Sequence, residues 1–334
     1  RCRAVLADGD GRLLFEAVLP GRGHGPAVSP DGRWAVVPAR RPGRFAAVID
    51  LEARTLAGLM QSPPGRHFQG HVVFAPDSRT LIATENDFEA GRGVLGLWDI
   101  ERRERTGEVA SDGVGPHQLL LDPGGRAVTV ANGGILTHPD RDRAKLNIPT
   151  MRPNLRRIEI ATGKILAGGA LPDAHHKVSL RHMDAAPDGT VLVGGQDEGP
   201  AGGDAPLVFL WPMGGDSPPI LELPIPDLRR LDRYVGSVAV DRTGRLGATA
   251  SPRGGRVLLF DLARGGALVD ALSLADACGL VRDVTRDGTF FVSNGMGRLY
   301  RLSVAPTGRA VMESIAGPRP SAAMWDNHLA TRPA

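Results

Sequence analysis

Five of the nine histidines occupy one recurring position along the sequence. Four come shortly before a tight turn of the Pro-Asp-Gly kind, and the fifth lies near the end of the chain. The five are His24, His71, His117, His182 and His328. Neutral imidazole is the commonest metal ligand, and several imidazoles together suit copper, zinc, iron or nickel. A single histidine usually just hydrogen-bonds a neighbour, whereas five at one position predict a transition-metal site, copper or iron. The competing interpretation is a polar channel in which they bind only water.

Two repeats lack a histidine at this position. The repeat near residue 235 has Ser237, and the one near residue 280 has Cys278 and Arg282 close by. A thiolate from Cys278 would be a soft ligand and would favour copper. The ring of histidines is therefore expected to be open on this side. Polar side chains expected to surround the metal or to bind a ligand are His67, Glu85, Asn86, Asp87, Asn132, His138, Arg181, Arg253, Asp326 and Asn327.

A repeated unit must position these side chains. Each unit has a short apolar strand, a tight turn such as Pro30-Asp31-Gly32 or Pro187-Asp188-Gly189, a second strand, a loop, and a strand that ends near an acidic residue. Short strands at this spacing predict an all-β seven-bladed β-propeller, a single domain over residues 1–334. The predicted blades cover about 22–60, 68–110, 115–171, 179–223, 234–272 and 278–315, with the last blade closed by strands from both termini, 1–20 and 321–332.

The topology of a propeller blade explains why the histidines should meet. The first strand of every blade lines the central channel, so its start and the loop between the second and third strands share one mouth. The insertion over residues 133–154 is the longest of these loops. A long loop without an element of its own is often a lid or a binding loop. We therefore expect residues 133–154 to cover part of the mouth.

Composition excludes several classes of function. The net charge is only +3, aromatic residues make up 4%, and Lys145, Lys164 and Lys177 are the only lysines, so nucleic-acid binding is not expected. Cys2 and Cys278 allow at most one disulfide. No apolar stretch reaches the roughly 20 residues that span a bilayer. Since the sequence begins at Arg1, we expect that a signal segment was removed.

The motifs around these residues resemble a known bacterial family. It consists of exported, twin-arginine-dependent β-propeller proteins encoded beside imelysin-type iron-uptake proteins and a dihaem thiol-oxidoreductase-like protein. The motifs are 65–71 (GRHFQGH), 84–89 (TENDFE), 115–117 (GPH), 131–135 (ANGGI), 137–140 (THPD), 179–182 (SLRH), 251–255 (SPRGG) and 325–328 (WDNH). The resemblance implies a periplasmic location, an association with iron acquisition, and an imelysin-type or dihaem protein as partner.

Three hypotheses for the function follow. The first is periplasmic metal handling, for uptake of iron or copper or for redox chemistry, by a protein that is a monomer. The second is a calcium-dependent hydrolase of the lactonase type, in which Glu85, Asn86, Asp87, Asn132, Asn294 and Asp326 would supply oxygen ligands. The third is a scaffold without catalysis that docks a partner, since fold does not determine function. The five histidines favour the first, because calcium prefers oxygen ligands.

Overall fold

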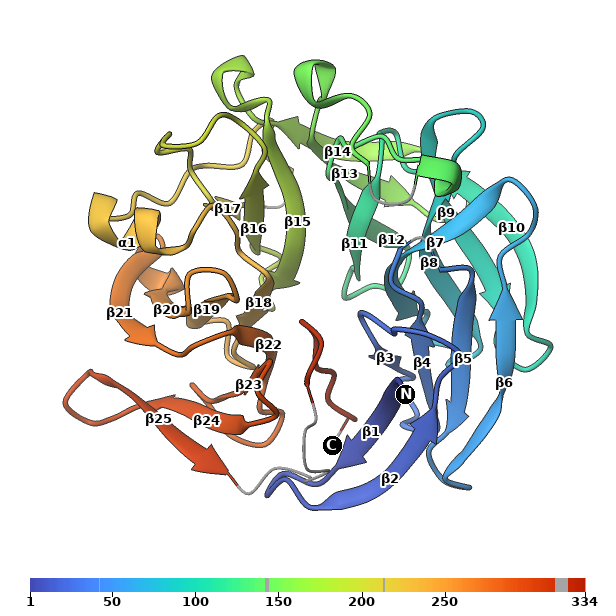
Figure 1. Ribbon diagram of the computed structural model, residues 1–334, viewed down its shortest axis with the longest axis horizontal. Coiled ribbons are helices and arrows are strands. Elements are labelled where there is room, and N and C mark those ends of the chain that lie inside the picture. Colours follow the sequence, from blue (N-terminus) through green and yellow to red (C-terminus); the bar gives the residue numbers. More distant parts are fainter. Residues whose placement is uncertain (42, 142–143, 213, 316–323, 334) are drawn as a thin grey trace.

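The computed structural model describes residues 1–334 except 42, 142–143, 213, 316–323 and 334. Seven antiparallel sheets are arranged around a common centre (Figure 1). Five have four strands: β3–β6 (Ala27–Val28, Trp34–Pro38, Phe45–Asp50, Thr55–Gln61), β7–β10 (Arg66–Phe74, Thr80–Asp87, Arg92–Asp99, Glu104–Ala110), β11–β14 (Pro116–Leu121, Ala127–Asn132, Asn154–Glu159, Ile165–Ala170), β18–β21 (Ser237–Val240, Leu246–Ser251, Arg256–Asp261, Ala267–Ser273) and β22–β25 (Ala277–Arg282, Phe290–Asn294, Leu299–Val304, Ala310–Ile315). The all-β prediction is confirmed, and the arrangement is that expected of a seven-bladed propeller.

The other two sheets are smaller. One contains β15 (Val178–Ala185), β16 (Val191–Asp197) and β17 (Val208–Trp211), and the other contains β1 (Arg3–Ala7) and β2 (Leu13–Val18). In the first, an isolated bridge between Phe209 and Ile220 stands where a fourth strand would lie. Pro218 and Pro219 precede this bridge, and proline cannot donate to a strand ladder. The short helix α1 (Ile225–Arg230) follows.

Aspartates form the turns that the repeat predicted. In the first turn of the second blade, Asp77 accepts hydrogen bonds from the backbone of Arg79 and Thr80 at 2.9 and 2.8 Å. In the later turn, Asp99 accepts from the backbone of Glu101 and Arg102, both at 3.0 Å. These bonds satisfy backbone donors that the turn removes from the ladder. The periodic Asp residues therefore delimit the strands.

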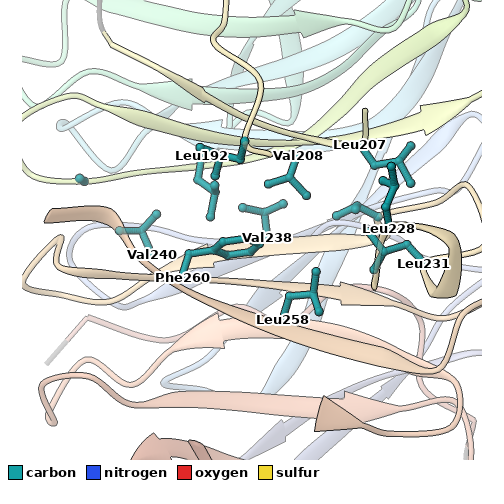
Figure 2. Packing of buried hydrophobic residues seen from close by; sticks show 12 residues of the cluster. Leu192, Leu207, Val208, Leu228, Leu231, Val238, Val240, Leu258 and Phe260 are labelled. Carbon is teal, nitrogen blue, oxygen red and sulfur yellow. The ribbon is translucent and has the colours of Figure 1, made fainter. Parts of the chain in front are cut away.

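The apolar core lies between neighbouring sheets. Figure 2 shows Leu192 and Val208 from one sheet facing Val238 and Phe260 from the next, all almost fully buried. Similar clusters lie at other interfaces, for example the one that contains Val48 of the first blade and Phe68 and Trp98 of the second. The first strands β3, β7, β11, β15, β18 and β22 each contact the first strand of a neighbouring sheet, so these strands surround the centre.

The seventh blade differs from the prediction. The sheet β1–β2 contacts the sheets on both sides of it: Arg301 donates to the carbonyl oxygen of Gly9 at 3.0 Å, and Ala17 packs with Val37. However, residues 324–333 contain no strand and pair with neither β1 nor β2, and residues 321–323 lie outside the described residues. The expected closing strand from the C-terminus is therefore wrong for the part of it that is described.

The C-terminal segment, defined here as residues 324–333, lies inside the ring instead (Figure 1). A Cβ atom added to Gly279 would lie 2.8 Å from the side chain of Leu329, and one added to Gly32 would lie 2.7 Å from that of Arg332. Gly279 is near the start of the innermost strand β22. Gly32 is in the turn after the innermost strand β3, at the opposite end of the channel. The segment therefore runs along the channel from one mouth towards the other. Within the described residues, no helix is long and apolar enough to cross a membrane.

Candidate metal centre in the channel

β-Bulges position three of the histidines. The register of β7 shifts between Phe68 and Val72, that of β11 between Pro116 and Gln118, and that of β15 between Leu180 and His182. A bulge adds one residue to a strand and redirects its side chains, and it is typical of strands beside functional sites. In β18, which carries Ser237 instead of histidine, the pairing with β19 is regular, whereas β22, which also lacks a histidine, shifts register between Ala277 and Leu280. Bulges therefore redirect the side chains near His71, His117 and His182, but they are not confined to the strands that carry a histidine.

The five imidazoles form one cluster. The ring centroids of His71 lie 5.1 Å from His24, 5.0 Å from His117, 5.8 Å from His182 and 4.5 Å from His328. The rings of His117 and His182 are 4.7 Å apart, and those of His24 and His328 are 4.5 Å apart. Most of these pairs meet edge to face. The structure thus brings together all five histidines predicted from the sequence, and His71 is at their centre.

Two sets of three nitrogens are close enough to share an ion. One set comes from His24, His71 and His328, the other from His71, His117 and His182, and the ligand atoms of each set lie within 4.8 Å of one another. Among the described residues, Nε2 of His71, His117 and His328 and Nδ1 of His182 have no hydrogen-bond partner. Buried polar atoms are almost always paired, so these four nitrogens are candidates for binding a metal ion or water. These residues fit a transition metal with imidazole ligands.

Burial holds the cluster in its neutral form. Removal from water lowers the pKa of all five histidines, and the neighbouring imidazoles and Arg181 lower most of them further. A neutral imidazole has a free lone pair, whereas an imidazolium cannot bind a metal. The cluster is therefore in its ligating state at neutral pH.

In metal-free protein, the free energy of unfolding is expected to decrease as the pH falls below about 6.5. Histidines of the unfolded chain take up protons near 6.5, while the buried imidazoles stay neutral, so the unfolded state binds more protons. Each such histidine lowers the free energy of unfolding by up to about 1.4 kcal/mol for each pH unit below 6.5. Urea unfolding with chelator at about pH 7.5, 6.5 and 5.5 measures this. We expect His117→Gln to flatten the profile, whereas a flat profile in the unaltered protein would contradict the expectation.

Asp326 and Tyr234 orient two of the histidines. Nδ1 of His24 lies 3.0 Å from Oδ1 of Asp326, and Nε2 of His182 lies 3.4 Å from the hydroxyl of Tyr234, which also accepts from Asn327 at 3.1 Å. A carboxylate on one imidazole nitrogen leaves the other as the ligand atom and makes it more basic. Arg22 and His24 hold the pKa of Asp326 far below its usual range although burial alone would raise it. Asp326 is thus a carboxylate that supports His24.

Glycines make room for the cluster. A Cβ on Gly25 would lie 2.4 Å from Nδ1 of His71, and a Cβ on Gly70 would lie 2.6 Å from Cδ2 of His24. Gly70 also has a φ of +106°, which L side chains rarely adopt. The close approach of these two backbones therefore depends on the absence of side chains.

A matched pair of glycine variants can separate backbone strain from contact with the cluster. Gly65 has a φ of +75° and no atom within 4 Å of an added Cβ, whereas Gly70 has both a positive φ and the contact with His24. We expect Gly65→Ala to lose about 1–2 kcal/mol of unfolding free energy through strain alone. Gly70→Ala should lose about 1–3 kcal/mol more through overpacking and should displace His24. Urea unfolding and the imidazole NMR signals measure both effects, and equal losses would contradict the role given to Gly70.

Cys278 is not in either set of ligand atoms. The thiol is buried, lies 3.1 Å from the carbonyl oxygen of Asp276, and has its pKa raised to about 12, mainly by burial. The structure therefore does not place Cys278 in either set of candidate ligand atoms, and its role as a metal ligand stays a prediction. The thiols of Cys2 and Cys278 are both free.

The carboxylates and amides proposed as calcium ligands have other partners. Glu85 accepts from Trp98 Nε1 at 2.8 Å and pairs with Arg105, also at 2.8 Å. Asp87 pairs with Arg66 at 2.9 Å, and Asn132 bonds Ser111 at 2.8 Å. The bonds of Glu85 and Asp87 join strands of their own blade, whereas Ser111 follows β10 and links Asn132 to the second blade. These three side chains thus use their polar atoms in bonds to other parts of the protein, which gives no support to calcium ligation in the channel.

His67, Asn86 and His138 lie at the insertion over residues 133–154 rather than in the cluster of five histidines. Asn86 donates to the carbonyl oxygen of Thr137 at 3.1 Å and contacts Nε2 of His67 at 3.3 Å, while Phe88 packs on the ring of His138. At the far end of the same insertion, Lys145 pairs with Glu198 of the fourth blade. The described part of 133–154 therefore extends between the second and fourth blades, on the side of the histidines. Arg253 stacks over Tyr234, one layer behind His182.

A small cavity opens beside the cluster, and sequence analysis missed most of its lining. Its volume is about 30 Å³, and it is lined by His24, Arg40, Arg41, Gln69, His117, Arg181 and Tyr234. Tyr234 is one of only two tyrosines in the chain, a scarcity that could have drawn attention to it. No comparable feature of the sequence marked Arg40, Arg41 or Gln69 as part of a site.

A family model covers residues 17–332 of the chain. Its description is "Protein of unknown function (DUF1513)". The chain belongs to the DUF1513 family. The match spans every histidine of the cluster, from His24 to His328. No curated protein matches this DUF1513 chain.

Solved structures support the fold of the DUF1513 protein. The chain is similar to hydrazine synthase of Kuenenia stuttgartiensis, with a TM-score of 0.63 and 15% identity over 91% of this chain and 87% of that one. It is also similar to a chain in the structure "Crystal Structure of Mitotic Checkpoint Complex", with a TM-score of 0.66 and 12% identity over 93% and 82%. At such identities the likeness concerns the fold alone.

Proposed function

We propose that this protein binds a transition-metal ion in the channel through the imidazoles of His24, His71, His117, His182 and His328. The observation that carries the proposal is that four buried imidazole nitrogens of one cluster lack a hydrogen-bond partner within the described residues. Leaving a buried polar atom unpaired costs about 1–3 kcal/mol each, and a bound ion would recover that loss. Such an ion would supply Lewis-acid or one-electron chemistry at the mouth of the channel.

Copper is the metal we favour, with iron as the alternative. Each set of candidate ligands is entirely imidazole, without a carboxylate or thiolate. Non-haem iron sites typically include a carboxylate, whereas among divalent first-row ions copper binds nitrogen ligands most tightly. The resemblance in sequence to propellers encoded beside iron-uptake proteins is the support for iron.

The metal content of protein purified without an affinity tag tests the proposal. We expect about one equivalent of copper, retained after dialysis, because copper binds nitrogen ligands most tightly among divalent first-row ions. Elemental analysis before and after reconstitution with copper, iron and zinc measures it. Less than about a tenth of an equivalent of every metal, before and after loading, would overturn the proposal.

We also propose that the metal is handled in the periplasm, with an imelysin-type or dihaem protein as partner. The resemblance of the motifs is the support for this assignment. A strain that carries His71→Ala separates it from a docking scaffold without metal. If metal handling is the function, the variant should lose cellular iron or copper uptake; uptake at the normal rate by a variant that binds no metal would favour the scaffold.

A further inference from the structure

The two sets of candidate ligand atoms come from different parts of the fold. His71, His117 and His182 lie on the innermost strands β7, β11 and β15 of three neighbouring sheets. The other set also uses His71, but it adds His24, just before β3, and His328 of the C-terminal segment. Neither set contains a fourth histidine. The cluster therefore offers two overlapping positions, the segment position (His24, His71, His328) and the strand position (His71, His117, His182).

The charges around the cluster favour one ion at a time. Within the described residues, Asp326 is the only carboxylate that bonds to a histidine of the cluster, with Oδ1 3.0 Å from Nδ1 of His24. The positive charge of Arg181 acts on all five imidazoles. Like charges repel strongly where burial limits solvation. A second cation in this centre would therefore be opposed, and the two positions are alternatives.

The segment position should hold the ion more tightly. Its His24 contacts the carboxylate of Asp326, and a carboxylate on one imidazole nitrogen makes the other nitrogen more basic. In the strand position, the corresponding partner of His182 is the neutral hydroxyl of Tyr234, at 3.4 Å. Charge and basicity both place the resting ion in the segment position.

The segment position can open without breaking a sheet. No backbone hydrogen bond joins residues 324–333 to any other described residue. Side chains hold this segment instead, for example that of Asp326, which pairs with Arg22 and Arg40. If the segment withdrew, the imidazole of His328 would leave with it. The strands that carry the strand position would stay paired, because none of them pairs with this segment.

We propose that the centre holds one metal ion in two alternative positions, tightly in the segment position and more weakly in the strand position, and that His71 keeps the ion bound as it moves between them. Movement of the C-terminal segment would then control how tightly the ion is held. This inference rests on the proposed metal binding and deepens it, because two positions with a shared ligand suit an ion that is passed on. The metal would be cargo rather than a fixed cofactor.

Copper titration of two single variants tests the two positions. His328→Ala removes only the segment position, so the affinity should fall at least about 100-fold, while about one equivalent still binds at saturating copper. His182→Ala removes only the weaker strand position, so the affinity should change by less than about 2-fold. The electron paramagnetic resonance spectrum of bound Cu(II) should be unchanged in His182→Ala and altered in His328→Ala.

Controls show whether a loss is specific to the positions. The double variant with His182→Ala and His328→Ala should lose copper binding, because neither position is complete. His176→Ala, outside both positions, should bind copper as the unaltered protein does. Circular dichroism shows whether each variant is folded, and glutamine replaces alanine where the smaller side chain prevents folding.

The pattern of losses separates this inference from the proposed function. If His182→Ala weakens copper binding as much as His328→Ala does, one ion uses both sets at once, and the two positions are overturned while the metal site stands. If His328→Ala binds no copper at saturation, the strand position does not exist, and the inference is again overturned. If the unaltered protein takes up no metal, the proposed function and this inference both fail.

Discussion

Replacing His71 by alanine should abolish metal binding. His71 is the one histidine that belongs to both sets of ligand atoms, and its ring lies within 5.8 Å of all four others. Changes in residues that only orient a ligand cost about 10–100-fold in metal affinity, so loss of this central ligand should cost at least about 100-fold. Competition against a chromophoric chelator measures the affinity.

Thermal unfolding provides a second measurement for His71→Ala. A metal at 100 times its Kd stabilises the native state by about 2.7 kcal/mol, so copper should raise the Tm of the unaltered protein and not that of the variant. Without metal the variant should be folded, because Nε2 of His71 has no partner among the described residues to lose. His176→Ala, at a half-buried histidine outside the cluster, is the control. A variant that keeps the affinity and the copper-dependent rise in Tm would contradict the assignment.

Deletion of residues 324–334 is the second change with a large expected effect. The deletion removes His328, Asp326 and Asn327 but no strand of any described sheet. We therefore expect the circular dichroism of the propeller to persist. The affinity for the metal should fall at least about 100-fold, because the deletion removes the imidazole of His328 and the carboxylate of Asp326 that contacts His24.

A peptide with the sequence of residues 324–334 should restore metal binding to the shortened protein. The same peptide with His328→Ala should not, because it carries the support for His24 but lacks the imidazole. Met324→Ser is the control in the full chain, since this side chain is 82% exposed. Undiminished metal binding after the deletion would show that the C-terminal segment only fills the channel.

The fold was predictable because its signals are local. A Pro-Asp-Gly turn and an aspartate after the third strand act within a few residues, as the bonds made by Asp77 and Asp99 show. The same logic predicted that His71, His117 and His182 share a mouth. It failed for the described residues 324–333, because apolar residues such as Trp325 suit a strand as well as a segment inside the channel.

The residues around the centre show the limit of this reasoning. Cys278 has the right type and position in its repeat, but its thiol contacts Asp276. Glu85 and Asn132 are of the right type and near the same mouth, but Glu85 bonds Trp98 and Asn132 bonds Ser111. Sequence position does not say which way a side chain turns, because a single bulge redirects it.

The sequence by itself determined that the chain forms repeated four-stranded units with five histidines near one mouth, because strand periodicity and turn chemistry are read from neighbouring residues. Only the tertiary structure decided that His328 arrives on a segment that runs along the channel, and that Gln69 and three arginines enclose a cavity beside the cluster. These contacts join residues hundreds of positions apart. They depend on how the seven sheets pack around one centre. This packing cannot be predicted from patterns of neighbouring residues.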